Sequence, residues 1–259
     1  MPAPTLVLGT PCWIDLFSSD TARAKDFYGR LFGWTTMDPG PDYGGYFLFQ
    51  KDGKVVAGCM ANDGSMGGPD TWTLYLHTDD ADRTVEAAKA QGAPVYVEPM
   101  DVTQNGRMAM VADPGGAAFY LLTPLPQDDS TPPGGPDAPG TIGWHELASS
   151  AGEKAAFAFY SGLFGWETMD EMDMGAMGTY RIFGAGGVQL GGMMDKPENV
   201  PASAWTFYVN VDGLDAAVDR IAAKGGQVAM GPMEVPGGSW IVQGIDPQGA
   251  SFALVAAKR

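Results

Sequence analysis

The chain opens with two periodicities in succession. Mixed apolar and polar residues at 10–16 predict a β-strand. Apolar residues then recur at helical spacing, between an N-cap at Ser19-Asp20 and a stop at Gly33. The order of one strand, one helix and three strands begins again near residue 72, with a second helix expected at 81–90. The other strands are expected at 35–37, 46–50, 55–60, 72–78, 95–98, 108–112 and 119–122.

The second half of the chain repeats the first. Sequence landmarks recur at near-constant offsets of 131, 132 and 133 residues, which predicts a tandem duplication. The matched pairs are Trp13-Ile14-Asp15-Leu16 with Trp144-His145-Glu146-Leu147, Leu31–Trp34 with Leu163–Trp166, and Trp72-Thr73 with Trp205-Thr206.

The repeat predicts the domain organisation. A Pro- and Gly-rich segment, 126–140, is expected to link two domains at 6–125 and 141–257. One βαβββ module has too few strands to bury its own sheet face. We therefore predict an α+β fold with four βαβββ modules paired into two domains, each a curved mixed sheet that encloses a cleft and carries its helices outside. Fusion places the two copies at high effective concentration, so we expect a monomer with pseudo-two-fold domain pairing.

Composition narrows the classes of function. The formal net charge is −16, which argues against nucleic acid and against an anionic membrane surface as partners. Two cysteines are too few for a disulfide framework. The N-terminal residues lack the features of a signal peptide, and apolar runs are too short to span a bilayer. We expect an acidic cytoplasmic protein with a small-molecule partner.

The repeated residues resemble one known family, the vicinal oxygen chelate superfamily, which holds glyoxalase I, bleomycin resistance proteins and extradiol dioxygenases. The two-domain form resembles actinobacterial glyoxalase-like proteins, some of them labelled hydroxylases. The resemblance implies the fold and leaves the reaction open, because one fold hosts many chemistries. It is carried by Asp20, Ala24, Phe27-Tyr28, Leu31–Trp34, Asp113-Pro114 and Gly116-Ala117, and by Ala156, Phe159-Tyr160, Leu163–Trp166, Asp246-Pro247 and Gly249-Ala250.

Metal-dependent members of that family bind a divalent cation through His and Glu side chains on four strands. In this chain the positions implied by the resemblance hold no such ligand, and the two histidines, His77 and His145, cannot complete a site alone. We therefore expect no metal and no other cofactor. The positions are Trp13, Thr73, Tyr120 and the segment 57–60 in the first copy, and Trp144, Thr206, Ala253 and the segment 190–193 in the second.

Strand alternation predicts what lines each cleft instead. If Trp13 faces the cleft, Asp15 faces it too, and if Thr73 faces the cleft, so do Tyr75 and His77. Aromatic walls with a few polar groups suit a flat, conjugated ligand. The expected ligand-binding residues are Trp13, Thr73, Tyr75, Arg107 and Tyr120 in the first copy, with Arg107 at the rim, and Trp144, Glu146, Thr206 and Tyr208 in the second.

Two functions fit this lining. The protein binds a small aromatic or apolar metabolite or antibiotic, as bleomycin resistance proteins do, or it is a metal-independent lyase, isomerase or hydroxylase-type enzyme. In the second case Asp15 or His77 would be catalytic and move a proton. A structural alternative is that Asp15 and Glu146 anchor buried backbone or indole N–H groups.

The two copies differ in the residues that matter for these functions. The second copy replaces His77 with Asn210 and Tyr120 with Ala253. Imidazole exchanges protons near neutral pH, so we expect polar recognition or proton chemistry in the first copy only. The second copy also carries Met169, Met172, Met174 and Met177, where we expect an acidic loop with methionines packed beneath it or an adaptable lid.

Overall fold

A computed structural model describes residues 7–65, 68–102, 106–125, 137–198 and 200–259. Its helices are α1 (Thr21–Phe32), α2 (Ala81–Ala90), α3 (Glu153–Phe164) and α4 (Leu214–Ala223), with short 3-10 turns at Pro41–Tyr43 and Gly175–Met177. The strands of the first copy are β1 (Pro11–Ser18), β2 (Thr35–Met37), β3 (Phe47–Lys51), β4 (Lys54–Ala61), β5 (Thr71–His77), β6 (Val95–Val102), β7 (Gly106–Ala112) and β8 (Ala118–Pro124). Those of the second are β9 (Ile142–Ser149), β10 (Glu167–Asp173), β11 (Thr179–Ala185), β12 (Val188–Asp195), β13 (Ala204–Asn210), β14 (Gln227–Glu234), β15 (Trp240–Ile245) and β16 (Ser251–Ala256).

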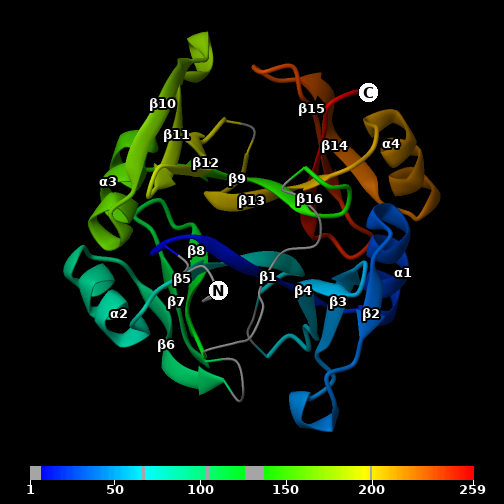
Figure 1. The fold of residues 1–259 in the computed structure, drawn as a ribbon, viewed down its shortest axis with the longest axis horizontal. Helices are drawn as coiled ribbons and strands as arrows, with labels where there is room; N and C mark the ends of the chain where they lie inside the picture. Colours follow the sequence, from blue (N-terminus) through cyan, green and yellow to red (C-terminus); the bar gives the residue numbers. More distant parts are fainter. Residues whose placement is uncertain (1–6, 66–67, 103–105, 126–136, 199) are drawn as a thin grey trace, which may run out of the picture. The chain divides into compact units, whose positions relative to one another are not determined.

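The strands form two mixed sheets, which confirms the predicted α+β class (Figure 1). The order is β2-β3-β4-β1-β5-β8-β7-β6 in one sheet and β10-β11-β12-β9-β13-β16-β15-β14 in the other. Each sheet has two edge strands, so neither is closed into a barrel. β1 is parallel to β4 and β5 is parallel to β8, whereas hairpins such as β7–β8 are antiparallel. No helix in the described ranges is long and apolar enough to cross a membrane.

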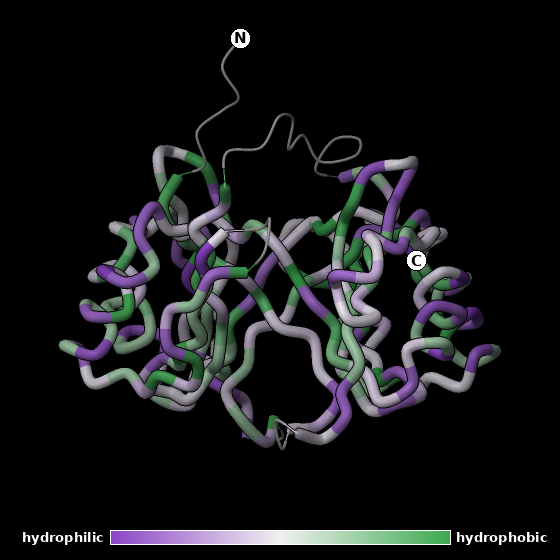
Figure 2. The backbone as a smooth tube through the Cα atoms, turned by 90° about the horizontal axis from the view of Figure 1, so that it is seen from below, coloured by the Kyte–Doolittle hydropathy of each residue, from purple (hydrophilic) through white to green (hydrophobic). Residues whose placement is uncertain are grey.

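Local sequence signals explain the helix boundaries. The Asp20 carboxylate accepts a hydrogen bond from the Arg23 amide at 3.0 Å, and Asp80 accepts the same bond from Arg83 in the second helix. Gly33 ends α1 with a φ of 69°, in the left-handed region that favours glycine. Hydrophilic and hydrophobic residues alternate along the helices, as expected for elements with one buried face (Figure 2).

The described residues divide into two compact units that do not coincide with the sequence repeats. Of the described residues, unit 1 contains 7–13, 74–102, 106–125, 144–198 and 200–206, and unit 2 contains 14–65, 68–73, 137–143 and 207–259. The predicted domains, 6–125 and 141–257, follow the duplication, whereas each compact unit combines segments from both copies. Most of the predicted linker, residues 126–136, lies outside the described residues.

A buried chain of hydrogen bonds joins the two copies inside unit 2. The Trp72 indole donates to the Tyr28 hydroxyl at 2.8 Å, and this hydroxyl donates to the Asp246 carboxylate at 2.9 Å. Asp246 also accepts from the backbone amides of Gln248 and Ala250 in its turn. Burial and the Asp246 charge raise the pKa of Tyr28, so its hydroxyl stays protonated and donates. Residues that carry the repeat and the family resemblance therefore form one polar network.

Unit 1 contains the equivalent network with the copies exchanged. The Trp205 indole donates to the Tyr160 hydroxyl at 2.9 Å, and Tyr160 donates to Asp113 at 3.4 Å. Asp113 is 1% exposed, and burial raises the pKa of its carboxyl group. The tyrosine here comes from the second copy and the aspartate from the first, which is the reverse of unit 2.

The structure corrects one prediction about the second copy. Residues 167–173 form strand β10 and pair with β11 in antiparallel register, so Met169 and Met172 lie in a strand instead of a loop. The register shifts between Thr168 and Asp170, so Met169 lies at an irregularity of this strand. Only the short turn around Met174 and Met177 remains outside regular strands.

Removal of one hydroxyl should test the buried network. Tyr28→Phe leaves the Trp72 indole and one Asp246 oxygen without their partner, so we expect the free energy of unfolding to fall by about 2–3 kcal/mol. Tyr160→Phe should cost less, because its hydroxyl lies farther from Asp113 than that of Tyr28 does from Asp246. Urea unfolding of both variants gives the comparison, and equal losses would contradict it.

Candidate functional site

A carboxylate–phenol pair in unit 2 joins Asp15 of β1 to Tyr46, the residue before β3. The Tyr46 hydroxyl donates to the Asp15 carboxylate at 2.8 Å, and Asp15 is 6% exposed. Gly58 on β4 stands in register with Asp15, and a Cβ atom at Gly58 would collide with both the phenol oxygen and the carboxylate. The glycine therefore provides the room in which the pair meets.

Unit 1 repeats this arrangement, and an indole takes part in it. The Trp144 indole donates to the Tyr180 hydroxyl at 2.8 Å, and Tyr180 donates to the Glu146 carboxylate at 3.0 Å. Burial and the Glu146 charge raise the pKa of Tyr180, so its hydroxyl remains a donor. Gly192 again faces the phenol oxygen, where a Cβ atom would collide with it.

The two tyrosines and the two glycines were missed by sequence reasoning. Tyr46 and Tyr180 are related by the duplication at an offset of 134, as are Gly58 and Gly192. This offset is the signal that could have found them. The Glu146 contact agrees with the structural alternative, in which the carboxylate anchors polar groups, although its partner is a phenol that in turn accepts from the indole.

A second cluster occupies one face of β5, β7 and β8 in unit 1. The rings of Tyr75 and Tyr120 stack with centroids 4.5 Å apart and an interplanar angle of 12°. Cross-strand partners share a face of a sheet, so the register places further side chains beside these rings. We call this cluster the Tyr75 face, and it consists of Tyr75, His77, Met108, Met110, Tyr120 and Leu122.

His77 is the polar member of the Tyr75 face. His77 is 6% exposed, and its Nε2 atom lies 3.2 Å from the Asp79 carboxylate. Its Nδ1 atom is buried and has no hydrogen-bond partner within the described part of the chain. A buried nitrogen of this kind is uncommon and points to a missing donor or acceptor.

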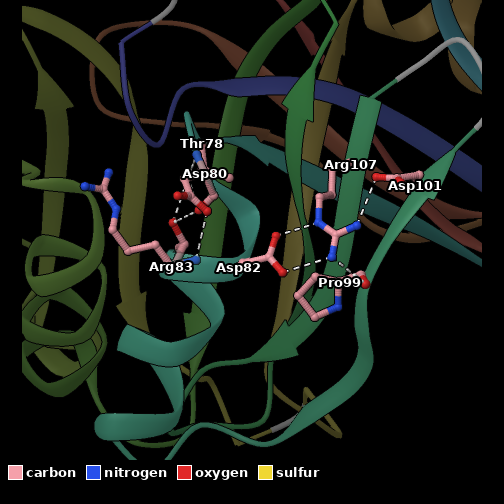
Figure 3. Close-up of polar contacts among 8 residues, drawn as sticks. Thr78, Asp80, Asp82, Arg83, Pro99, Asp101 and Arg107 are labelled. Carbon is pink, nitrogen blue, oxygen red and sulfur yellow. Dashed lines mark hydrogen bonds and ion pairs between the residues drawn. The ribbon is translucent and has the colours of Figure 1, made fainter.

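Arg107 lies on the other face of the same sheet (Figure 3). Its guanidinium donates to Asp82 at 2.9 Å, to Asp101 at 2.9 Å and to the Pro99 carbonyl at 3.1 Å. Asp82 belongs to α2, and side chains alternate along β7, so Arg107 points to the helix side while Met108 points away from it. Its predicted part in ligand binding stays a prediction that these contacts do not support.

The equivalent face in unit 2 differs in chemistry. Tyr208 is in register with Ala253, whereas its counterpart Tyr75 is in register with Tyr120. The Gln243 amide donates to the Tyr208 hydroxyl at 3.0 Å. Asn210, the counterpart of His77, donates to the Thr141 hydroxyl at 3.2 Å. This face therefore carries an amide and a phenol in place of an imidazole and two stacked rings.

The remaining predicted residues divide between the units. Trp13 is half-buried in β1 and belongs to unit 1, whereas Thr73 is 7% exposed and belongs to unit 2. Thr206 is half-buried in β13. Asp15 belongs to unit 2 and His77 to unit 1, so their convergence in one cleft stays a prediction.

A separate pocket of about 160 Å³ lies in unit 1, near the start of α2. The Thr78 and Thr84 hydroxyls in its wall bond to each other at 2.7 Å, so their polar groups are already satisfied. Arg83 lies beside them, and its backbone amide caps the helix through Asp80 (Figure 3). None of the predicted site residues lines this pocket, whose walls are Leu8, Thr78, Arg83, Thr84, Ala87 and Leu163.

The side chains at the family's metal positions do not fit a divalent cation. The Trp144 indole donates its proton to Tyr180, and an alanine at position 253 has no donor atom for a metal. Among the residues that the structure describes, no three His, Cys, Asp or Glu side chains converge in a way that could hold a metal ion.

His145 does not join either cluster as a titrating group at neutral pH. It lies half-buried in β9, between Trp144 and Glu146. Desolvation by burial lowers the pKa of its imidazole to about 4, while a hydrogen bond with the Leu190 backbone acts in the opposite direction. The ring is therefore neutral at pH 7 in the folded protein.

Comparison with known proteins identifies the class. The sequence model of the Glyoxalase/Bleomycin resistance protein/Dioxygenase superfamily matches residues 11–121 and 153–254, and the chain belongs to this family. CFP32 of Mycobacterium tuberculosis, provisionally named a glyoxylase, is 35% identical over 251 residues, covering 95% of this chain and 94% of the relative. The anthracycline biosynthesis protein DnrV of Streptomyces peucetius is 35% identical over 264 residues, covering 95% and 93%.

Solved structures show the same fold at low sequence identity. The Mn(II)-bound glyoxalase from Novosphingobium aromaticivorans superposes with a TM-score of 0.68 at 15% identity, covering 97% of this chain and 83% of that one. Homoprotocatechuate 2,3-dioxygenase from Arthrobacter globiformis gives a TM-score of 0.66 at 12% identity, covering 99% and 81%. These neighbours establish the fold and the resemblance expected from the sequence, and they leave the reaction open.

A substitution at Gly58 should separate the carboxylate–phenol pair. In Gly58→Ala the new methyl group displaces Tyr46 or Asp15, so we expect a loss of about 2–4 kcal/mol in the free energy of unfolding. Gly68→Ala is the matched control, because a Cβ atom there meets nothing within 4 Å. Denaturant unfolding measures both, and similar losses in the two variants would refute the steric role of Gly58.

The buried imidazole of His145 should make the folding stability depend on pH in the acid range. The imidazole has a pKa of about 6.5 in the unfolded chain. Between pH 6.5 and 4, His145 is therefore protonated in the unfolded chain and neutral in the folded one. As pH falls through this window, His145 therefore lowers the free energy of unfolding by up to about 3 kcal/mol. Unfolding of wild type and His145→Met across this range checks the prediction, and it fails if both lose stability in parallel.

Proposed function

We propose that this protein binds a planar aromatic small molecule at the Tyr75 face of its first copy, without a divalent cation. The observation that carries the proposal is the parallel stack of Tyr75 on Tyr120 beside a buried imidazole nitrogen that has no partner in the described chain. Flat rings bind well to such a surface, since aromatic pairs contribute beyond their buried area.

The side chains around the stack support this ligand class. Met110 is in register with Tyr120 and Met108 with Leu122, and thioether side chains adapt to ligands of varied outline. Tyr75 is 6% exposed and Tyr120 is 3% exposed, so a ligand reaches them only after covering residues move. Binding should then be slower than diffusion, with a rate that reports the opening step.

The named relatives agree with an aromatic ligand. DnrV of Streptomyces peucetius and DauV of Streptomyces sp. strain C5 are anthracycline biosynthesis proteins, at 35% and 34% identity to this chain. Anthracyclines are planar aromatic compounds. A polyketide-type ring system is therefore the first class of compound to test, with quinones beside it.

A metal-independent enzyme is the second candidate. It is favoured by the His77–Asp79 contact at 3.2 Å, because a carboxylate that holds one imidazole nitrogen prepares the other for proton transfer. Asp15 is a further candidate acid or base through its contact with Tyr46. Recovery of the compound after incubation distinguishes the two functions: a binding protein returns it unchanged, and an enzyme does not.

Truncation of the stacked rings should weaken ligand binding. A panel of quinones and aromatic polyketides is first ranked by the rise in melting temperature, and the best compound is titrated by calorimetry. Tyr75→Ala and Tyr120→Ala should each raise its Kd by about tenfold or more, because each removes one aromatic contact and its buried area.

The control for these variants is Tyr96→Ala. Tyr96 is 59% exposed on edge strand β6 and lies outside the Tyr75 face, so its loss should leave Kd unchanged. Equal weakening by all three variants would indicate a global effect on folding. Lack of binding by every compound in the panel would overturn the proposed function.

A further inference from the structure

The unsatisfied nitrogen of His77 indicates a polar group that the ligand carries in addition to its aromatic rings. The Nδ1 atom is buried without a partner in the described chain, although the residue is held between regular backbone hydrogen bonds to Gly9 and Thr10. A buried polar atom left without a hydrogen bond costs about 1–3 kcal/mol. The fold therefore tolerates an unfavourable group at this place, which a bound molecule can satisfy.

The contact with Asp79 indicates which hydrogen-bonding group the bound molecule must carry. A carboxylate only accepts hydrogen bonds, so in the neutral ring the proton resides on Nε2, 3.2 Å from the Asp79 oxygen. The Nδ1 atom then presents a lone pair, and it can only accept. In this neutral form a hydrogen-bond donor is the group that completes the nitrogen.

The imidazole of His77 lies on the same face of the sheet as the aromatic stack. Tyr75 and His77 are two residues apart on β5 and point to the same face, which places their Cα atoms about 6.6 Å apart. Tyr120 and Leu122 are their partners in register on β8. A ring system that contacts the tyrosines thus brings a substituent on its edge toward His77.

From this geometry we propose that the ligand is a hydroxylated aromatic compound whose phenolic hydroxyl donates to Nδ1 of His77, with Asp79 as the positioning residue that selects the acceptor tautomer. This inference rests on the proposed function and adds the polar group that the ligand must carry. A buried acceptor discriminates strongly against an analogue that lacks the donor, because the nitrogen then stays unsatisfied.

The second copy offers the matched comparison. Asp212 stands at the position equivalent to Asp79, offset by 133, but the residue two positions before it is Asn210. The Asn210 amide donates to the Thr141 hydroxyl, and an amide has no ring nitrogen whose proton position Asp212 could select. A change at Asp212 should therefore leave recognition of the hydroxyl untouched.

Two probes of nearly equal shape test the inference. Calorimetry compares 2-naphthol with 2-methoxynaphthalene, in which a methyl group replaces the hydroxyl proton. Wild type should bind the naphthol about tenfold more tightly than the ether, and Asp212→Asn should keep this ratio. In Asp79→Asn the new amide can donate to Nε2, so the proton moves to Nδ1 and the ratio should fall to about one. His77→Leu should give the same loss of discrimination.

A spectroscopic measurement separates this mechanism from a merely structural effect. Nitrogen-15 NMR of the histidines should show the Nε2–H tautomer of His77 in wild type and the Nδ1–H tautomer in Asp79→Asn. Asp79 is 62% exposed in its side chain, so the substitution should leave the melting temperature nearly unchanged.

The outcomes distinguish this inference from the proposed function. If wild type binds both probes equally, the hydroxyl does not reach Nδ1 and the inference is overturned while aromatic binding stands. A preference for the naphthol that persists in both Asp79→Asn and His77→Leu also overturns it. If neither probe nor any larger aromatic compound binds, the proposed function itself fails.

Discussion

The buried Trp–Tyr–Asp network is the interaction on which the rest of the structure depends. In unit 2 it joins Tyr28 of the first copy to Asp246 of the second, 218 residues away, and in unit 1 it joins Tyr160 to Asp113 in the opposite sense. A buried carboxylate without its donors is strongly unfavourable, so each copy needs the other to complete its core. This explains why the compact units cross the boundaries of the sequence repeat, and why a single copy would expose an incomplete network.

The same duplication places a carboxylate–phenol pair in each unit. Asp15 with Tyr46 and Glu146 with Tyr180 occupy equivalent positions, each beside a glycine that leaves room for the phenol oxygen. A pair retained in both copies is explained by a shared structural need, which is a hydrogen bond to a carboxylate that is buried in one copy and half-buried in the other. The function is better sought where the copies differ, at the faces around Tyr75 and Tyr208.

The sequence predicted much of the fold because its signals are local. Helix α2 begins and ends where Asp80 and the apolar spacing predicted, and the family resemblance is confirmed. The tyrosine partners of Asp113 and Asp246 could not be predicted, since these donors come from the other copy. Arg107 shows the same limit: it stands in a strand as expected, but only the register and its contact with Asp82 reveal that it faces α2.

Divergence between the two faces then indicates how a duplicated fold can acquire one specific site. Ala253 opposite Tyr208 removes the ring that Tyr120 stacks on Tyr75, and Asn210 replaces the imidazole of His77. In unit 2 the polar groups of this face bond to the protein itself, through Gln243 and Thr141. In unit 1 the imidazole keeps one nitrogen for Asp79 and leaves the other without a protein partner in the described chain. A face that satisfies its own polar groups has little to gain from a polar ligand, whereas an unsatisfied acceptor beside stacked rings gains a hydrogen bond only when a donor binds.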